Sequence, residues 1–131
     1  MDNVEAVVLI IEDVDSIIQV MRASLTGWPV RIEAANDGEK GLQLVRELRP
    51  DVVLLDLAMP KMDGWELLEL VQQDPATRDI PVVIVTAHGE SDGAQRAQDA
   101  GARGFVSKPF RPSEIRRAIE PFLPRSNPVT A

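Results

Sequence analysis

Polar side chains suited to phosphate and metal chemistry stand at the ends of four short apolar runs in the 131-residue sequence. They are Glu12 with Asp13, Asp56, Thr86 and Lys108. Carboxylates are the ligands that Mg²⁺ takes together with waters and a phosphate oxygen. An aspartate can also attack a phosphoryl group, while an ammonium and a hydroxyl can bind the phosphoryl oxygens. The set indicates metal-assisted phosphoryl transfer, provided that the fold brings the four positions together.

The apolar runs before these residues have the composition of strands buried on both faces. Ala6–Ile11 and Val52–Leu55 are unbroken apolar runs without the alternation of a half-exposed strand. We expect further strands at Val30–Ala34, Ile80–Val85 and Phe105–Val106. Because parallel strands present their carboxyl ends at one edge of a sheet, where open α/β sheets bind ligands, the polar residues are expected to meet there.

Helical patterns separate the expected strands. Pro50 and Gly101 end two of these helices, Asn36 or Asp37 can cap one, and Pro112 suits a first helical turn. Five strands alternating with five helices predict a doubly wound α/β domain with a parallel sheet and right-handed crossovers. The apolar stripes of the four stronger helices are Val14, Ile17, Ile18 and Met21; Leu44, Val45 and Leu48; Leu67, Leu68 and Val71; and Ile115, Ala118, Ile119 and Phe122.

The helix expected at Gly89–Ala100 differs from the others, because its apolar residues are all alanines and it contains Gly93. A helix with few buried apolar contacts opens at low free-energy cost. We therefore expect it to be the most mobile helix of the domain, with faster amide hydrogen exchange over residues 89–101 than in the strands.

Composition excludes several other classes of protein. The net charge of −7 disfavours direct nucleic-acid binding, and the absence of cysteine excludes disulfides. No apolar run approaches the ~20 residues of a membrane span, and the amino end lacks the basic flank of a signal peptide, so we expect a cytoplasmic protein without membrane contact. Residues 1–124 are predicted to form one domain and residues 125–131 a flexible tail or the start of a linker. The lone histidine, His88, is interpreted as an exposed loop residue.

The motifs at the strand ends resemble the receiver domain of two-component response regulators, in particular the chemotaxis-regulator type. The resemblance covers roughly residues 5–123. It implies a flavodoxin-like fold, in which a five-stranded parallel sheet has the order 2-1-3-4-5. The motifs that carry it are Glu12-Asp13, the segment Asp56-Leu-Ala-Met-Pro-Lys-Met-Asp-Gly64, Thr86-Ala87 and Lys108-Pro109-Phe110.

By this resemblance Asp56 is the phosphoacceptor, and the donor is a histidine kinase or a histidine phosphotransfer protein. The implied cofactor is Mg²⁺, with Mn²⁺ as a substitute. Asp13 and Asp56 would bind the ion directly, together with the backbone carbonyl of Ala58, and Glu12 would act through a water. The protein would then catalyse nothing but its own phosphorylation and dephosphorylation.

The resemblance also assigns the switch residues. Thr86 and Lys108 would contact the phosphoryl group, and Lys108-Pro109 would be a cis peptide. Phe105 stands where an aromatic side chain turns inward on activation, so a conformational change is expected at the face formed by the helix at 89–100, the fifth strand and the last helix. The receiver would be a monomer or a phosphorylation-dependent dimer, with a downstream partner that its sequence does not name.

Two alternatives of other classes remain open at this point. A magnesium-dependent phosphatase could use Asp56 as its nucleophile, although such enzymes usually carry a second aspartate where this chain has Ala58. A flavodoxin-like cofactor binder would need a phosphate-binding loop after the first strand, where the acidic Glu12-Asp13-Val14-Asp15 would repel a phosphate. Incubation with Mg²⁺ and a small phosphodonor would distinguish the three.

Overall fold

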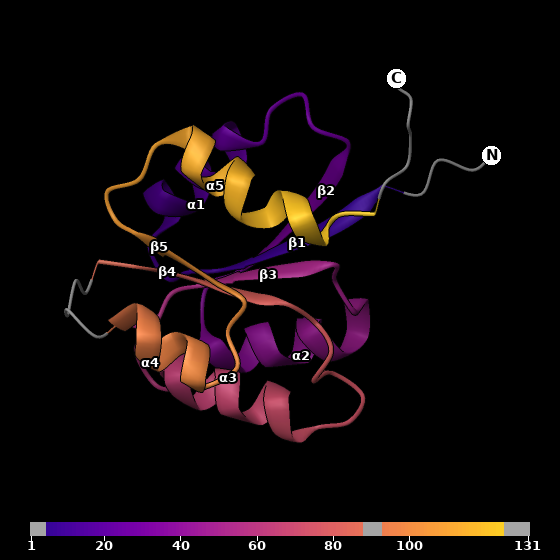
Figure 1. Ribbon diagram of the computed structural model, residues 1–131, viewed down its shortest axis with the longest axis vertical. Coiled ribbons are helices and arrows are strands. Elements are labelled where there is room, and N and C mark those ends of the chain that lie inside the picture. The colour runs from indigo at the N-terminus through magenta and orange to yellow at the C-terminus, as the bar shows by residue number, and fades with distance from the viewer. Residues whose placement is uncertain (1–4, 88–92, 125–131) are drawn as a thin grey trace.

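The computed structural model describes residues 5–87 and 93–124, which form a three-layer α/β structure around one parallel sheet (Figure 1). The sheet has the order β2-β1-β3-β4-β5, with all neighbouring strands parallel. The predicted fold class and strand order are therefore confirmed. The strands are β1 (Ala6–Ile11), β2 (Val30–Ala35), β3 (Val52–Leu55), β4 (Val82–Thr86) and β5 (Gly104–Ser107).

Helices cover both faces of the sheet. In Figure 1, α1 and α5 lie on one side of the sheet and α2, α3 and α4 on the other. A short 3₁₀ turn, η1 (Glu120–Phe122), follows the last helix. The helices are α1 (Asp15–Ser24), α2 (Gly38–Leu48), α3 (Gly64–Gln73), α4 (Gly93–Asp99) and α5 (Pro112–Ile119).

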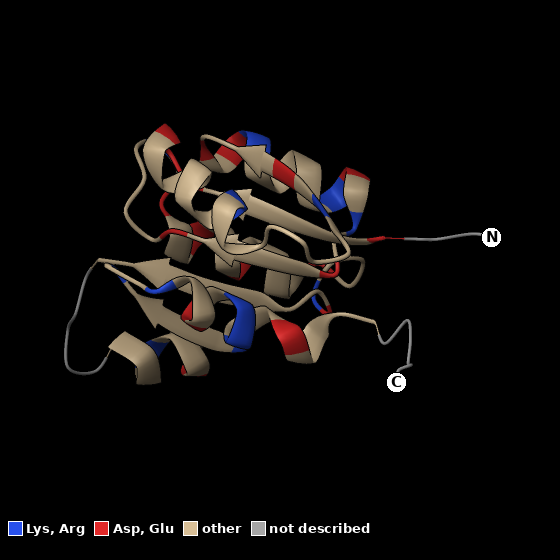
Figure 2. Ribbon diagram, turned by 90° about the horizontal axis from the view of Figure 1, so that it is seen from above, with Lys and Arg blue, Asp and Glu red and all other residues tan. Residues whose placement is uncertain are grey.

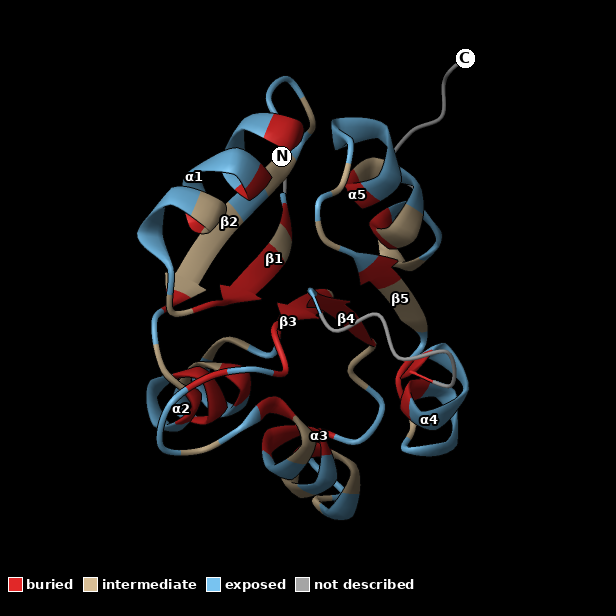
Figure 3. Cartoon of the chain, turned by 90° about the vertical axis from the view of Figure 1, so that its left-hand side faces the viewer, coloured by how far each residue is buried: buried red, intermediate tan, exposed pale blue. Residues whose placement is uncertain are grey.

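This arrangement explains why the central strands are apolar throughout. Alternate residues of β1, β3 and β4 enter two separate cores, one under α2, α3 and α4 and the other under α1 and α5. In the first core Ile11, Leu55 and Ile84 are fully buried, and in the second Ile10 and Leu54 are. Figure 3 shows the central strands buried between helices whose outer faces are exposed, and Figure 2 shows charged residues mainly on helices and loops.

Aspartate side chains cap the N-termini of α2 and α3. The Asp37 carboxylate accepts a hydrogen bond from the N–H of Lys40 at 2.8 Å, and the Asp63 carboxylate accepts one from Glu66 at 2.9 Å. These bonds satisfy N–H groups that have no partner within the helix. They fix where α2 and α3 begin, and α3 begins directly after the loop that follows β3.

Two expectations differ in detail from the structure. Val14 is the residue before α1 rather than part of its buried stripe, and its side chain is 42% exposed. The fourth strand begins at Val82 and not at Ile80, because Pro81 has no N–H to donate to a neighbouring strand. His88, the first residues of the expected helix at 89–100, and the tail at 125–131 lie outside the described residues.

Candidate functional site

The register of the two central strands sets the geometry of the acidic residues. Ile11 of β1 pairs with Leu55 of β3, so the next residues, Glu12 and Asp56, leave the sheet at the same level. The N–H of Asp56 donates to the carbonyl of Ile11 at 3.0 Å, which extends the ladder to the last residue before the loop. The carboxylates therefore project from adjacent strand ends at the carboxyl edge of the sheet.

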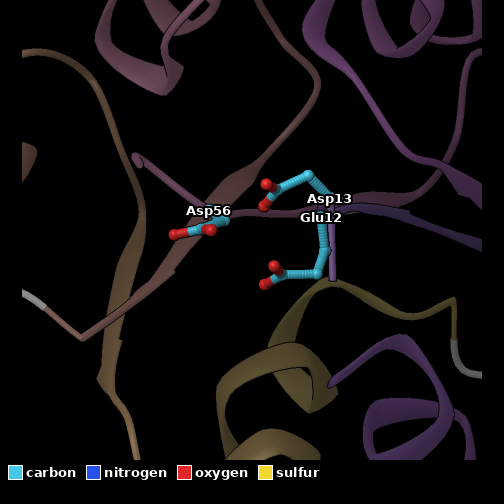
Figure 4. Close-up of side chains that lie close together, drawn as sticks. All are labelled: Glu12, Asp13 and Asp56. Carbon is cyan, nitrogen blue, oxygen red and sulfur yellow. The ribbon is translucent and has the colours of Figure 1, made fainter. Parts of the chain in front are cut away.

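Glu12, Asp13 and Asp56 form a compact acidic cluster. One carboxylate oxygen from each lies within 4.8 Å of the others. Figure 4 shows the carboxylates of Glu12 and Asp13 turned toward the side on which Asp56 lies. Glu12 is fully buried and Asp56 is 4% exposed, whereas Asp13 is half-buried. Because close carboxylates repel one another and burial disfavours their charge, such a cluster favours a bound cation.

The ammonium of Lys108 enters the same cluster. Its Nζ lies 2.7 Å from Glu12 Oε1 and 3.5 Å from Asp56 Oδ2, and its side chain is 13% exposed. The other oxygen of Glu12 accepts a hydrogen bond from the N–H of Val14 at 3.2 Å. Burial raises the pKa of Glu12, and the Asp56 carboxylate acts in the same direction, whereas the bond from Lys108 lowers it. Lys108 thus compensates a charge that the protein interior disfavours.

Thr86 and Phe105 lie on the neighbouring strands. Thr86 is the last residue of β4, is 1% exposed, and its carbonyl accepts a hydrogen bond from the N–H of Lys108 at 2.9 Å. Phe105 of β5 pairs with Ile84 and packs against the core under α2, α3 and α4. Since side chains alternate along a strand, Thr86 projects on the same side of the sheet as Ile84 and Phe105. The Lys108-Pro109 peptide is cis.

The loop after β3 holds Asp56 from the other side. The N–H of Ala58 donates to Asp56 Oδ1 at 3.2 Å, and Ala58 itself is exposed. Gly64 packs so closely that an added Cβ would lie 2.5 Å from the Asp56 carbonyl oxygen. Its N–H also donates to the Leu57 carbonyl at 3.0 Å. The Asp-Gly pair at 63–64 marked a loop in the sequence, but its role as a steric support for Asp56 requires the structure.

The donor set fits the magnesium ion that the sequence analysis implied. Mg²⁺ prefers oxygen ligands and commonly takes one or two carboxylates with several waters, and the cluster supplies three carboxylates from two strand ends. A hard cation there would reduce the repulsion among the carboxylates. Binding by the Ala58 carbonyl and through water by Glu12 stays a prediction.

Comparison with known proteins places this geometry in a family. A family model of the response regulator receiver domain matches residues 8–120. The chain belongs to this family. Receivers are the input domains of two-component signal transduction, so the family match gives no support to the phosphatase or flavodoxin-like alternatives.

Individual relatives agree with the family match. The receiver is 35% identical to a probable transcriptional regulator ycf27 of Guillardia theta over 92% of this chain and 46% of that protein. It is 33% identical to the DNA-binding dual master transcriptional regulator RpaA of Synechocystis, over 93% of this chain and 51% of that protein. The chain thus spans about half the length of these curated relatives.

Solved structures show the same fold. The chemotaxis protein CheY4 of Vibrio cholerae superposes with a TM-score of 0.83 at 28% identity, covering 92% of this chain and all of that one. The receiver domain of the sensor histidine kinase PA1611 of Pseudomonas aeruginosa has a TM-score of 0.81 over 91% of this chain and 98% of that one; at 23% identity this likeness concerns the fold alone. That structure holds a magnesium ion coordinated in its active site cleft. No helix among the described residues of the present receiver is long and apolar enough to span a bilayer.

Proposed function

We propose that this receiver is a signalling switch that accepts a phosphoryl group on Asp56 from a histidine kinase or a histidine phosphotransfer protein. The observation that supports this most directly is the position of Asp56. Its carboxylate is almost fully buried, belongs to a three-carboxylate cluster, and lies 3.5 Å from the ammonium of Lys108. A solvated surface aspartate has none of these features.

The transfer forms one bond and breaks one. A carboxylate oxygen of Asp56 forms a bond to phosphorus while the bond between phosphorus and the donor's imidazole nitrogen breaks. The bonding electron pair remains with that nitrogen, and the donor leaves as neutral imidazole because the other ring nitrogen carries a proton. In the product, Lys108 and the hydroxyl of Thr86 would bind phosphoryl oxygens, because an ammonium and a hydroxyl donate to the charge that the transfer develops there.

Asp13 and Asp56 would hold the divalent cation, with Glu12 beside it, and the cation would neutralise phosphoryl charge during the transfer. This chain's own residues prepare that position. Glu12 keeps Lys108 beside Asp56, and the N–H of Ala58 orients one Asp56 oxygen so that the other faces Lys108. The half-exposed Asp13 gives the site an opening to solvent.

Phosphorylation would replace a single carboxylate charge with a dianionic group that has three acceptor oxygens. Thr86, on the strand next to Phe105, would bond one of them by moving toward it. The space vacated on that side of the sheet is where Phe105 could repack. The change would be read at the face formed by α4, β5 and α5, in a monomer or a dimer that forms on phosphorylation.

Nucleic-acid contact and the range of reactions that the domain catalyses are also part of the proposal. RpaA is a DNA-binding regulator, but we propose that the present domain contacts no nucleic acid itself, given its net charge of −7. Its chemistry would be limited to its own phosphorylation and dephosphorylation.

Phosphorylation by a small phosphodonor tests the proposal. The purified chain is incubated with acetyl phosphate and Mg²⁺, and its intact mass is followed with time. We expect one phosphoryl group per chain, and no labelling of the Asp56→Asn variant or of the unmodified chain when EDTA is present from the start. Rapid release of phosphate over many turnovers without accumulation of the labelled chain would instead indicate a phosphatase, and a chain that shows neither labelling nor turnover with abundant Mg²⁺ would refute the proposal.

A further inference from the structure

A cation–π contact joins two helices on the side of the sheet that carries Phe105. The guanidinium carbon of Arg96 on α4 lies 4.1 Å from the ring centroid of Trp65 on α3. This is well within the ~6 Å over which a cation is attracted to an aromatic face. Figure 1 and Figure 3 both show α3 and α4 as neighbours on this side of the sheet.

Trp65 is firmly connected to the loop that holds Asp56. It follows Gly64, whose Cα is packed against the Asp56 carbonyl and whose N–H bonds to Leu57. The Asp63 cap fixes this first turn of α3, and the Trp65 ring packs on the adjacent core. A displacement of the Asp56 backbone therefore has a short steric route to the indole ring.

The other partner, α4, has little apolar surface of its own. Its buried residues are Gly93 and Ala97, so a single methyl group enters the core from this helix. By comparison, α3 buries three large side chains, Leu67, Leu68 and Val71. For the described part of α4, the contact with Trp65 therefore acts beside the buried Ala97 and the packing of the helix against β5.

Open space lies beside α4. A hollow of about 630 Å³ is lined by Ala94 and Gln98 of the helix and by residues up to Phe105 of β5. The helix thus has a defined contact toward α3 and open space beside the face that carries Ala94 and Gln98. Packed contacts on both sides would have held it in one position.

We propose that the Arg96–Trp65 contact is a latch that holds α4 in its resting position and is loosened when Asp56 is phosphorylated. This inference rests on the proposed function. It adds a second structural connection from Asp56 to α4, separate from the one through Thr86 and Phe105. The bulk and charge of a phosphoryl group displace the loop that Gly64 supports. Trp65 then moves relative to Arg96 and releases the helix.

Two variants and two readouts test the latch in the full chain. Arg96→Met removes the cation and keeps most of the side-chain bulk, whereas Arg103→Met makes the same charge change at an exposed arginine beside the hollow. Amide exchange of residues 93–99 is measured with and without beryllofluoride and Mg²⁺, which imitate a phosphoryl group on Asp56. Trp65 emission is measured in a Trp28→Phe background, where Trp65 is the single tryptophan.

The latch predicts about threefold faster exchange of α4 in resting Arg96→Met, as the loss of an exposed cation–π contact implies, and unchanged exchange in Arg103→Met. The exchange in resting Arg96→Met should be close to that of the activated unmodified chain. Beryllofluoride is expected to move Trp65 emission toward that of resting Arg96→Met. The latch alone would be overturned if both variants showed equal exchange of α4 and equal responses to beryllofluoride, while intact mass showed that acetyl phosphate labels the chain. An unlabelled chain would overturn the proposed function and the latch with it.

Discussion

Replacing Asp13 by asparagine should stabilise the receiver in the absence of metal. The change removes one of three carboxylates whose oxygens lie within 4.8 Å of one another, and it preserves the shape of the side chain. Two unit charges at that separation repel by about 3.5 kcal/mol at an effective dielectric of ~20 and by about 0.9 kcal/mol in water. Asp13 is half-buried and Lys108 already offsets part of the charge, so we expect a net gain of about 1–2 kcal/mol.

The same substitution should abolish the stabilisation by Mg²⁺. A ligand that binds the folded state at a hundred times its Kd adds about 2.7 kcal/mol to the free energy of unfolding. The unmodified chain should show such a rise with Mg²⁺ concentration, and Asp13→Asn should not. The order of stability of the two proteins therefore reverses between EDTA and saturating Mg²⁺.

Urea unfolding of both proteins, in EDTA and along a Mg²⁺ titration, measures these free energies. With a slope of about 2 kcal/mol per molar urea, the expected shift of the midpoint in EDTA is about 0.5–1 M. Asp15→Asn is the matched control, because Asp15 is an exposed residue in the first turn of α1. It should lose about 0.3–1 kcal/mol of helix-dipole stabilisation and keep the full response to Mg²⁺. A less stable Asp13→Asn protein in EDTA, or one that responds to Mg²⁺ like the control, would refute the reasoning.

Three further substitutions test the surroundings of Asp56. Lys108→Met should lower the free energy of unfolding in urea by about 3 kcal/mol, because it leaves the buried Glu12 carboxylate unpaired. Adding Glu12→Gln to that variant should restore much of the lost stability, and additive effects of the two substitutions would contradict the pairing. Gly64→Ala should lose about 1–3 kcal/mol of thermal stability and slow the phosphorylation of Asp56, because its Cβ meets a backbone oxygen; unchanged values would count against this support. Replacing the exposed Ala58 by methionine should lengthen the phosphoryl lifetime by obstructing water, and an equal half-life would disprove that role.

The strands and the polar residues at their ends could be predicted because the signals are local. Val52–Leu55 is an unbroken apolar run followed by Asp56, and this pattern is typical of a central parallel strand. Asp37 was one of two residues expected to cap α2, and the structure shows its side chain bonded to Lys40. The position of Val14 was mispredicted because helical spacing alone does not locate the residue at which the helix begins.

The contacts among distant residues could not be predicted in the same way. Lys108 and Glu12 are 96 residues apart, and their 2.7 Å contact depends on the order and register of strands that neither residue specifies. The family resemblance assigns Glu12 to the metal through water, whereas its pairing with Lys108 is visible only in the structure. Likewise, nothing in the sequence around Arg96 predicts its contact with Trp65, which exists because the fold places α4 beside α3.

The sequence by itself determined the fold class, the strand order through its family resemblance, and the residue types gathered at one edge of the sheet. These follow from apolar patterning and from a few polar residues at strand ends, which are local properties of the chain. The tertiary structure decided which oxygen faces which ammonium, how closely Gly64 packs against Asp56, and which residues of α3 and α4 meet. Such contacts depend on distances of a few ångströms between segments that are remote in sequence, and these distances exist only once both cores have packed.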